Sequence, residues 1–217
     1  MKKRYGVSES MSVIISEQFY EDNPLPRMTS AAIAIFQMDM IESDSLMDSV
    51  QNIADEAMPE NRKKEIAEDR DYLLSLSTPD ELLNYMRKRC ELANRHILCS
   101  KALEMEEEIM PELIHKWKRN GGDQFCEGAA LISSQAKEKY IDQIVDEFEE
   151  FQKPYGIYTC CTLLAFRNRT DALPKIMKAY KMIHSRSDLV SEDYDKGPLY
   201  AIYSLTDHEV PRYENIE

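Results

Sequence analysis

Glycine is scarce in this chain, with six residues among 217. No segment approaches the ~20 consecutive apolar residues that cross a bilayer, and alternating apolar and polar runs of strand type are nearly absent after residue 28. The sequence also lacks a glycine-rich phosphate loop, a spaced metal-ligand cluster and a nucleophile beside a base. These absences predict a helical protein with no membrane partner, no catalytic residue, no cofactor and no metal site.

Basic residues are also few relative to acidic ones. The chain has 27 Lys and Arg against 40 Asp and Glu, a formal charge of −13. Nucleic-acid binders concentrate Lys and Arg, so this balance argues against a nucleic-acid partner and permits a basic protein partner. The five cysteines form no C-x-x-C pair, which suits reduced thiols in a reducing compartment. The basic N-terminus "MKKRYGVSESMSVIIS" has too short an apolar stretch for a signal peptide, so we expect a cytoplasmic protein.

Residues that favour helices dominate, and the capping residues, prolines and glycines between them predict helix ends. "STPDELLNYMRKRCEL" carries a cap, a proline and two acids in the order expected of a helix start. A helix over about residues 94–108 is expected to end near Pro111, and the next is expected to stop at Gly121 and Gly122. A polar loop over about residues 185–197 is expected to precede the last helix, "PLYAIYSL".

Three segments share one apolar pattern at an interval of 31 to 32 residues. Within each copy the spacing is i, i+3, i+4, i+7, the apolar face of a helix. The aligned rows are Met110, Ile141 and Leu173; Leu113, Ile144 and Ile176; Ile114, Val145 and Met177; and Trp117, Phe148 and Tyr180. An earlier copy fits at Pro79, Leu82, Leu83 and Met86, and each copy precedes a second helix rich in small and apolar residues. Four such helix pairs indicate stacked repeats, because no pair can bury its apolar face alone.

These residues resemble the HEAT-like family of α-helical repeats, of the compact bacterial type, over about residues 77–205. The W-x-x-L-G signature of the rival tetratricopeptide repeats is missing. The resemblance implies an all-α, right-handed α-α superhelix, a solenoid of antiparallel helix pairs whose second helices line a concave binding surface. We divide the chain into an N-terminal arm (1–28) packed over the first helices, N-terminal helices forming an atypical capping repeat (29–76), the repeats (77–206) and a polar tail (207–217).

Several residues of reactive type have a more ordinary structural interpretation. Asp193, Asp195 and Gly197 resemble the start of a calcium loop, but the glycine comes one place early and no closing glutamate follows. His96 and Cys99 could share a helix face, yet nothing nearby completes a zinc site.

The adjacent cysteines Cys160 and Cys161 point about 100° apart on a helix, beside leucines, and are expected to be core residues. Some HEAT-like solenoids act as DNA glycosylases. Here the single tryptophan, Trp117, aligns with core positions of the other copies, so we reject that reading.

Two features suggest a binding surface. Acidic runs at residues 104–108 and 142–150 could attract a basic partner, although a solvated outer face is the commoner explanation. Tyrosines gather at the starts of second helices, near two arginines, in a composition typical of interfaces. The predicted partner-binding residues are Glu127, Tyr155, Tyr158, Arg167, Arg169, Tyr194, Tyr200 and Tyr203.

The sequence therefore predicts a non-enzymatic protein-interaction module, monomeric, that binds a partner protein on a concave helical face. One form of it is an acidic inhibitor or immunity-type protein for a basic partner. Two alternatives stay open. One is an enzyme whose polar residues converge around His184, Asp188 and Asp193 beside the 184–197 loop, and the other is a self-assembling structural repeat.

Overall fold

The computed structural model describes residues 15, 17–23, 58–88 and 94–206, and every regular element among them is a helix. The α-helices are α1 (Glu17–Asp22), α4 (Glu60–Ser75), α5 (Pro79–Lys88), α6 (Arg95–Glu104), α7 (Glu106–Trp117), α8 (Asp123–Gln135), α9 (Glu138–Asp146), α10 (Pro154–Phe166), α11 (Leu173–His184), α12 (Ser187–Val190) and α13 (Lys196–Leu205). Short 3₁₀ turns η3 (Phe148–Glu150) and η4 (Thr170–Ala172) join them. The chain is thus an all-α protein, as its composition predicts.

The start of α5 shows how local sequence positions a helix. The Glu81 carboxylate accepts hydrogen bonds from the backbone N–H groups of Ser77 (2.9 Å) and Thr78 (3.0 Å). In return, the Thr78 hydroxyl oxygen accepts the N–H of Glu81 at 3.4 Å. This reciprocal capping box satisfies donors that the first turn would leave unpaired. These bonds also lower the pKa of Glu81.

Two predicted boundaries are wrong. One helix ends at Glu104 and the next begins at Glu106, so Pro111 lies inside α7 instead of after a helix. Proline costs α7 one backbone hydrogen bond, but Ile109 and Met110 before it and Leu113 after it are all fully buried, and their burial outweighs that loss. The expected loop at 185–197 also contains the single-turn helix α12.

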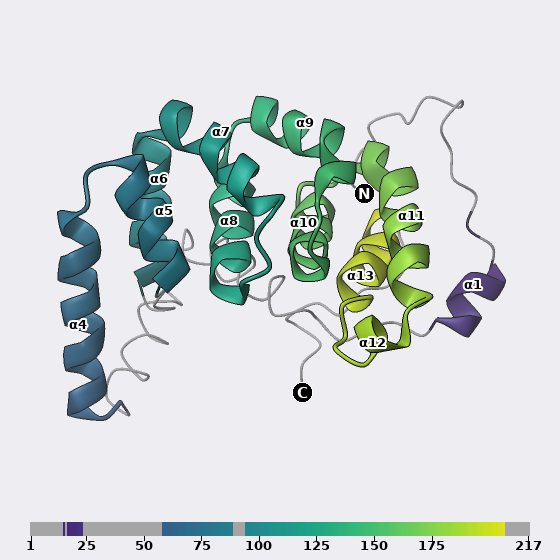
Figure 1. The fold of residues 1–217 in the computed structure, drawn as a ribbon, viewed down its shortest axis with the longest axis horizontal. Helices are drawn as coiled ribbons and strands as arrows, with labels where there is room; N and C mark the ends of the chain where they lie inside the picture. Colours follow the sequence, from purple (N-terminus) through teal and green to yellow (C-terminus); the bar gives the residue numbers. More distant parts are fainter. Residues whose placement is uncertain (1–14, 16, 24–57, 89–93, 207–217) are drawn as a thin grey trace, which may run out of the picture.

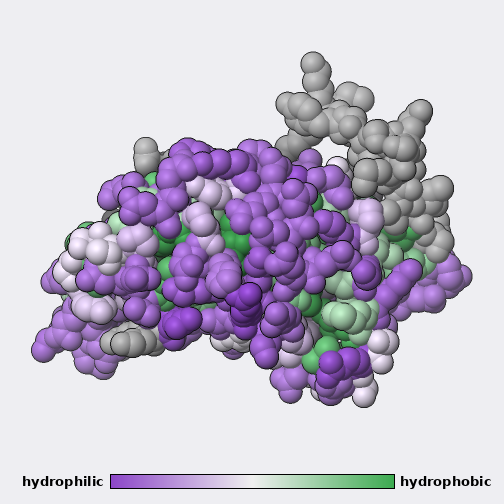
Figure 2. Space-filling view, turned by 45° about the horizontal axis from the view of Figure 1, so that its top comes forward, coloured by the Kyte–Doolittle hydropathy of each residue, from purple (hydrophilic) through white to green (hydrophobic). Residues whose placement is uncertain are grey.

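The helices between α5 and α13 lie in two rows (Figure 1). In one row α6 packs on α8, α8 on α10, and α10 on α13; we call these the second-row helices. In the other row α5 contacts α7, and α7 contacts α9, with α11 last. The side of the molecule that carries α7 and α9 is largely hydrophilic, and hydrophobic surface shows there mainly in recesses (Figure 2).

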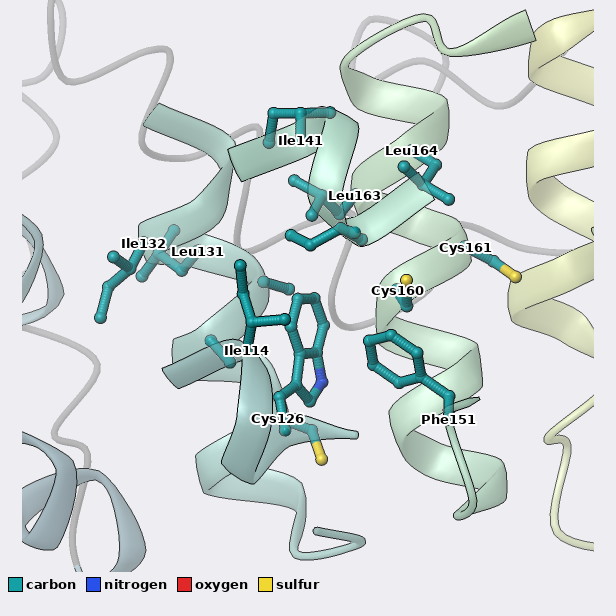
Figure 3. Close-up of a cluster of buried hydrophobic side chains, with 14 of the residues drawn as sticks. Ile114, Cys126, Leu131, Ile132, Ile141, Phe151, Cys160, Cys161, Leu163 and Leu164 are labelled. Carbon is teal, nitrogen blue, oxygen red and sulfur yellow. The ribbon is translucent and has the colours of Figure 1, made fainter. Parts of the chain in front are cut away.

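The apolar positions of the sequence pattern form the core between the rows. All the aligned residues from Met110 to Tyr180 are buried except Met177, which is partly buried. Trp117 is fully buried, donates its indole N–H to Thr159 at 3.2 Å and packs edge-to-face on Phe151. Its role is therefore structural. In Figure 3, Phe151 lies between α10 and Cys126 of α8, whereas Cys161 points away toward the C-terminal helices.

α10 contains the longest uninterrupted run of buried residues among the described helices. Residues 156–165 are all buried, and apolar residues lie on every side of the helix, as expected for a helix enclosed by protein. α13 approaches it so closely that a Cβ on Gly197 would lie 2.6 Å from the carbonyl oxygen of Tyr158. Glycine allows this approach because it has no side chain.

Of the predicted N-terminal arm, the described residues 15 and 17–23 lie against the last helices, not the first. α1 is at the α11–α13 end of the molecule, opposite α4 (Figure 1), and Phe19 and Tyr20 pack on the core there. Of the predicted N-terminal helices, α4 is described; those expected within residues 29–57 lie outside the described residues, as do Cys90 and the tail at 207–217. Within the described part, no helix combines the length and hydropathy needed to cross a bilayer.

Candidate interaction surface

Glu127 on α8 connects three second-row helices. Its carboxylate accepts a hydrogen bond from the Arg95 guanidinium of α6 at 2.9 Å and from the Tyr155 hydroxyl of α10 at 2.8 Å. The Arg95 and Glu127 side chains are only 12% and 19% exposed, so the pair is partly desolvated. Such a charge-assisted bond holds both groups in place more firmly than a surface ion pair would.

Tyrosines extend this contact along the row. The Tyr155 ring stacks on Tyr158, with centroids 5.2 Å apart and planes 12° apart. Its edge meets Tyr194, which precedes α13, at 6.1 Å. Tyr155 and Tyr194 are half-buried, whereas Tyr158 is only 8% exposed. The result is a rigid, partly exposed aromatic group held by a carboxylate.

We call this set the interaction strip; its members are Arg95, Glu127, Tyr155, Tyr158 and Tyr194. Four of the eight predicted partner-binding residues thus come together. Arg95 was missed from the sequence. The signal that could have found it is its position 32 residues before Glu127, close to the interval of the repeated pattern.

The two predicted arginines lie elsewhere and serve the fold. Arg167 donates to the backbone carbonyls of Ser134 and Ala136 at the end of α8, at 3.0 and 3.1 Å. A cation placed there satisfies carbonyls that the last turn leaves without partners. Arg169 forms a two-bond pair with Asp171 and a further bond to Asp142 at 2.7 Å. Asp171, with help from Asp142, raises the pKa of Arg169, and both arginines are committed to contacts within the chain.

Tyr200 and Tyr203 are buried and do not join the strip. Burial raises the pKa of Tyr200 to about 12, so its phenol stays neutral. The Tyr203 hydroxyl donates to the backbone carbonyl oxygen of Asn23 at 2.7 Å, beside α1.

The acidic runs are largely paired within the chain. Glu106 and Glu107 on α7 bind Lys137 and Lys139, which lie at the start of α9. Further along, Glu147 and Glu150 bind Lys118, and Glu149 binds Lys178 on α11. These partners lie 29 to 32 residues apart in sequence. Much of the acidic charge on these helices therefore links one helix pair to the next.

The residues around the 184–197 loop separate into two pairs. His184 lies 3.0 Å from the buried carboxylate of Asp195 and stacks on Tyr180, whereas Asp188 pairs with Arg186 at 2.7 Å. The sequence-based alternative of an enzyme site names His184, Asp188 and Asp193; of these, His184 and Asp188 have different partners. Asp193 has a left-handed backbone (φ 59°), as in a tight turn.

Thiols and metal ligands show no reactive arrangement in the described ranges. Burial raises the pKa of the Cys126 thiol to about 12 and also raises the pKa values of Cys160 and Cys161, so all three remain protonated at neutral pH. Across residues 58–88 and 94–206, no group of three or more His, Cys, Asp or Glu side chains is arranged to hold a metal ion.

A shallow depression of about 440 Å³ opens beside the start of α8. Arg87 lines it from α5, and the remaining lining residues are Asn120, Gly122, Asp123, Gln124 and Phe125. It is open to solvent and carries one cation and one anion on its rim. It therefore lacks the enclosed, convergent polar groups of a small-molecule site.

No protein-family model, no curated protein and no solved structure matches this chain. The support for the interaction strip as a candidate binding surface therefore comes from the contacts described above.

Proposed function

We propose that this protein is a short HEAT-like solenoid, a right-handed superhelix of helix pairs, that binds a protein partner through the interaction strip. Three features support the repeat architecture. Helices alternate between two rows, the aligned apolar positions are buried, and polar contacts link successive pairs at a similar sequence interval. Repeat arrays commonly use an extended row of second helices as a binding surface.

The binding proposal depends mainly on the fixed position of the partly exposed Tyr155 side chain. Its ring is fixed by Tyr158 and its hydroxyl by Glu127, so ordering it in a complex costs little conformational entropy. Tyrosine and arginine near the centre of a patch are the residue types that contribute most binding energy in protein interfaces. The strip includes one cation and one anion that neutralise each other, which favours a partner chosen by shape and aromatic contact.

A second form of the proposed function, in which the acidic helices bind a basic partner protein, has less structural support. Glu106, Glu107 and Glu147 already hold lysines of neighbouring helices, and a partner would have to displace those contacts. The charge of −13 still supplies a long-range attraction for basic proteins. A salt titration separates the two versions, because charge-driven binding weakens steeply with ionic strength and aromatic contact does not.

The test compares three tagged full-length baits in native lysate: wild type, Tyr155→Ala and Tyr72→Ala. Tyr72 is the matched control, since it is a 56% exposed tyrosine on α4 whose ring packs against Tyr85, which is not a member of the strip. We expect one protein to be captured by wild type and Tyr72→Ala and lost with Tyr155→Ala, with an affinity loss of roughly 30-fold for the purified pair.

Circular dichroism establishes that Tyr155→Ala is folded. Capture that is equal for all three baits, or no captured protein at low and high salt, would reject the strip as a binding surface. Capture that depends on salt but not on Tyr155 would instead support recognition by the acidic helices.

A further inference from the structure

The last helix pair is completed by a segment from the other end of the chain. Within the molecule, the α7 aromatic Trp117 is covered edge-to-face by Phe151 of the following pair, with centroids 5.3 Å apart at 84°. Tyr180 occupies the aligned position in α11, and no described helix pair follows it. Phe19 of α1 covers its ring instead, at 5.6 Å and 75°. α1 thus supplies the contact that a following pair would make.

Hydrogen bonds hold this segment by its backbone as well as by its side chains. The Tyr203 hydroxyl donates to the carbonyl oxygen of Asn23 at 2.7 Å and lies 3.2 Å from that of Tyr20. The Tyr180 hydroxyl donates to the Asn23 side-chain oxygen, and the Tyr20 hydroxyl donates to Thr206 at 2.7 Å. The Tyr20 ring also packs edge-to-face on Tyr203, with centroids 5.0 Å apart. Peptide-recognition sites can combine hydrogen bonds to the peptide main chain with pockets for its side chains.

α1 itself has six residues, too few for a helix to be stable alone in water. Its conformation therefore depends on the surface that receives it. The helix that follows among the described residues, α4, lies at the opposite end of the molecule (Figure 1). All the contacts above involve residues 19–23, so the receiving surface recognises a short local segment whichever copy of the chain supplies it.

We propose that Tyr180, Tyr203 and Thr206 form an end site that binds a short helical segment with the Phe19–Tyr20–Asn23 pattern. The chain fills this site with its own segment, and the same segment of a second copy fills it in trans. The end site is distinct from the interaction strip, so its test is independent of the proposed function.

The first experiment uses a fluorescent peptide of residues 15–23, ISEQFYEDN, and the full-length chain with Phe19→Ala and Tyr20→Ala, which vacates the end site. Anisotropy is expected to show binding to this variant and at least tenfold weaker binding to wild type, whose own segment competes. Adding Tyr203→Phe to the variant removes the hydroxyl that hydrogen-bonds to the backbone carbonyl oxygens of the segment. This change should lower the affinity for the peptide about tenfold. Adding Tyr72→Phe, on α4, should leave affinity unchanged.

The second experiment tests the second copy as donor. The Phe19→Ala/Tyr20→Ala chain is mixed with a Tyr180→Phe/Tyr203→Phe chain, which keeps α1 but has a weakened end site. Light scattering should show monomers for each alone and a 1:1 complex for the mixture. A mixture that stays monomeric overturns exchange between copies.

The proposal of an end site is overturned if the folded Phe19→Ala/Tyr20→Ala chain does not bind the peptide, or if adding Tyr203→Phe leaves the affinity for the peptide unchanged. If the Phe19→Ala/Tyr20→Ala chain fails to fold, wild type is used with a peptide carrying benzoylphenylalanine in place of Phe19. Photolabelling within residues 173–206 is then the supporting result, and labelling elsewhere or none overturns the proposal.

Discussion

At the scale of single residues, Gly197 sets the distance between α10 and α13. Gly197→Ala would place a Cβ 2.6 Å from the Tyr158 carbonyl oxygen and 2.7 Å from its Cα, both backbone atoms that cannot turn aside. Alanine gains about 1 kcal/mol in helix propensity, but overpacking costs typically ~1–3 kcal/mol and here falls at the upper end. We expect a net loss of about 1–2 kcal/mol in the free energy of unfolding, measured by urea denaturation.

Gly121→Ala is the control for that prediction. Its Cβ would lie 3.2 Å from Lys153 Cβ, and both residues are exposed, so a small shift can relieve the contact and the unfolding midpoint should stay near that of wild type. A Gly197→Ala protein as stable as wild type would show that α13 can shift away from α10 without loss.

Glu127 provides a second prediction at this scale. Glu127→Gln leaves the Arg95 guanidinium, 12% exposed, without its counter-charge. We expect a loss of about 1–3 kcal/mol in unfolding free energy, because a largely buried cation loses the group that offsets its desolvation. The control is Glu149→Gln, whose pair with Lys178 is exposed on both sides and should contribute little. Equal effects of the two substitutions would contradict the burial argument.

At the scale of helices, the link from α7 to α9 predicts a pH dependence. Lys139, Lys137 and Tyr140 donate hydrogen bonds to Glu107 and lower its pKa from 4.5 to about 2. Because the unfolded carboxyl has the higher pKa, its contribution to stability is complete above about pH 4.5 and is lost as pH falls toward 2. We expect Glu107→Gln to be less stable than wild type at pH 7, with a difference that narrows as pH falls from 4.5 to 3.

Urea unfolding across that pH range makes the measurement. A stability difference that does not change with pH would mean that Glu107 acts through packing and not through its charge.

The helices also show which local signals were sufficient for prediction. The capping box at Thr78 and Glu81 and the glycines after α7 were readable because cap and helix are neighbours in sequence. The prediction at Pro111 was wrong because the rule that proline ends a helix considers only the lost backbone hydrogen bond. The burial of Ile109 and Met110, which decides the outcome, depends on helices far away in the chain.

At the scale of the whole molecule, stability should be uneven along the rows. Among the residues of α4 only Asp69 and Leu73 are buried, whereas residues 156–165 of α10 all are. Local opening is cheapest where few apolar contacts break. We expect amide hydrogens of α4 to exchange roughly 100-fold faster than those of α10, measured by mass spectrometry. Uniform protection would instead indicate a single cooperative unit.

The sequence by itself determined the all-helical class, most helix positions and the buried face of each first helix. The buried faces follow from a periodicity within single helices of 9 to 12 residues, which backbone geometry converts directly into a face. Composition, and not periodicity, placed Tyr155, Tyr158 and Tyr194 with Glu127 in one candidate set of eight residues, because tyrosines gather near the starts of second-row helices.

The tertiary structure alone decided which charges pair, which tyrosines meet and where α1 docks. Arg95 reaches Glu127 across 32 residues, and Tyr20 reaches Thr206 across 186. Such contacts depend on how whole helices stack, and stacking is driven by apolar burial that has no direction of its own. The partner of a charge or a tyrosine therefore depends on how whole helices pack, which is why Arg167 and Arg169 looked like interface residues in sequence but form contacts within the fold.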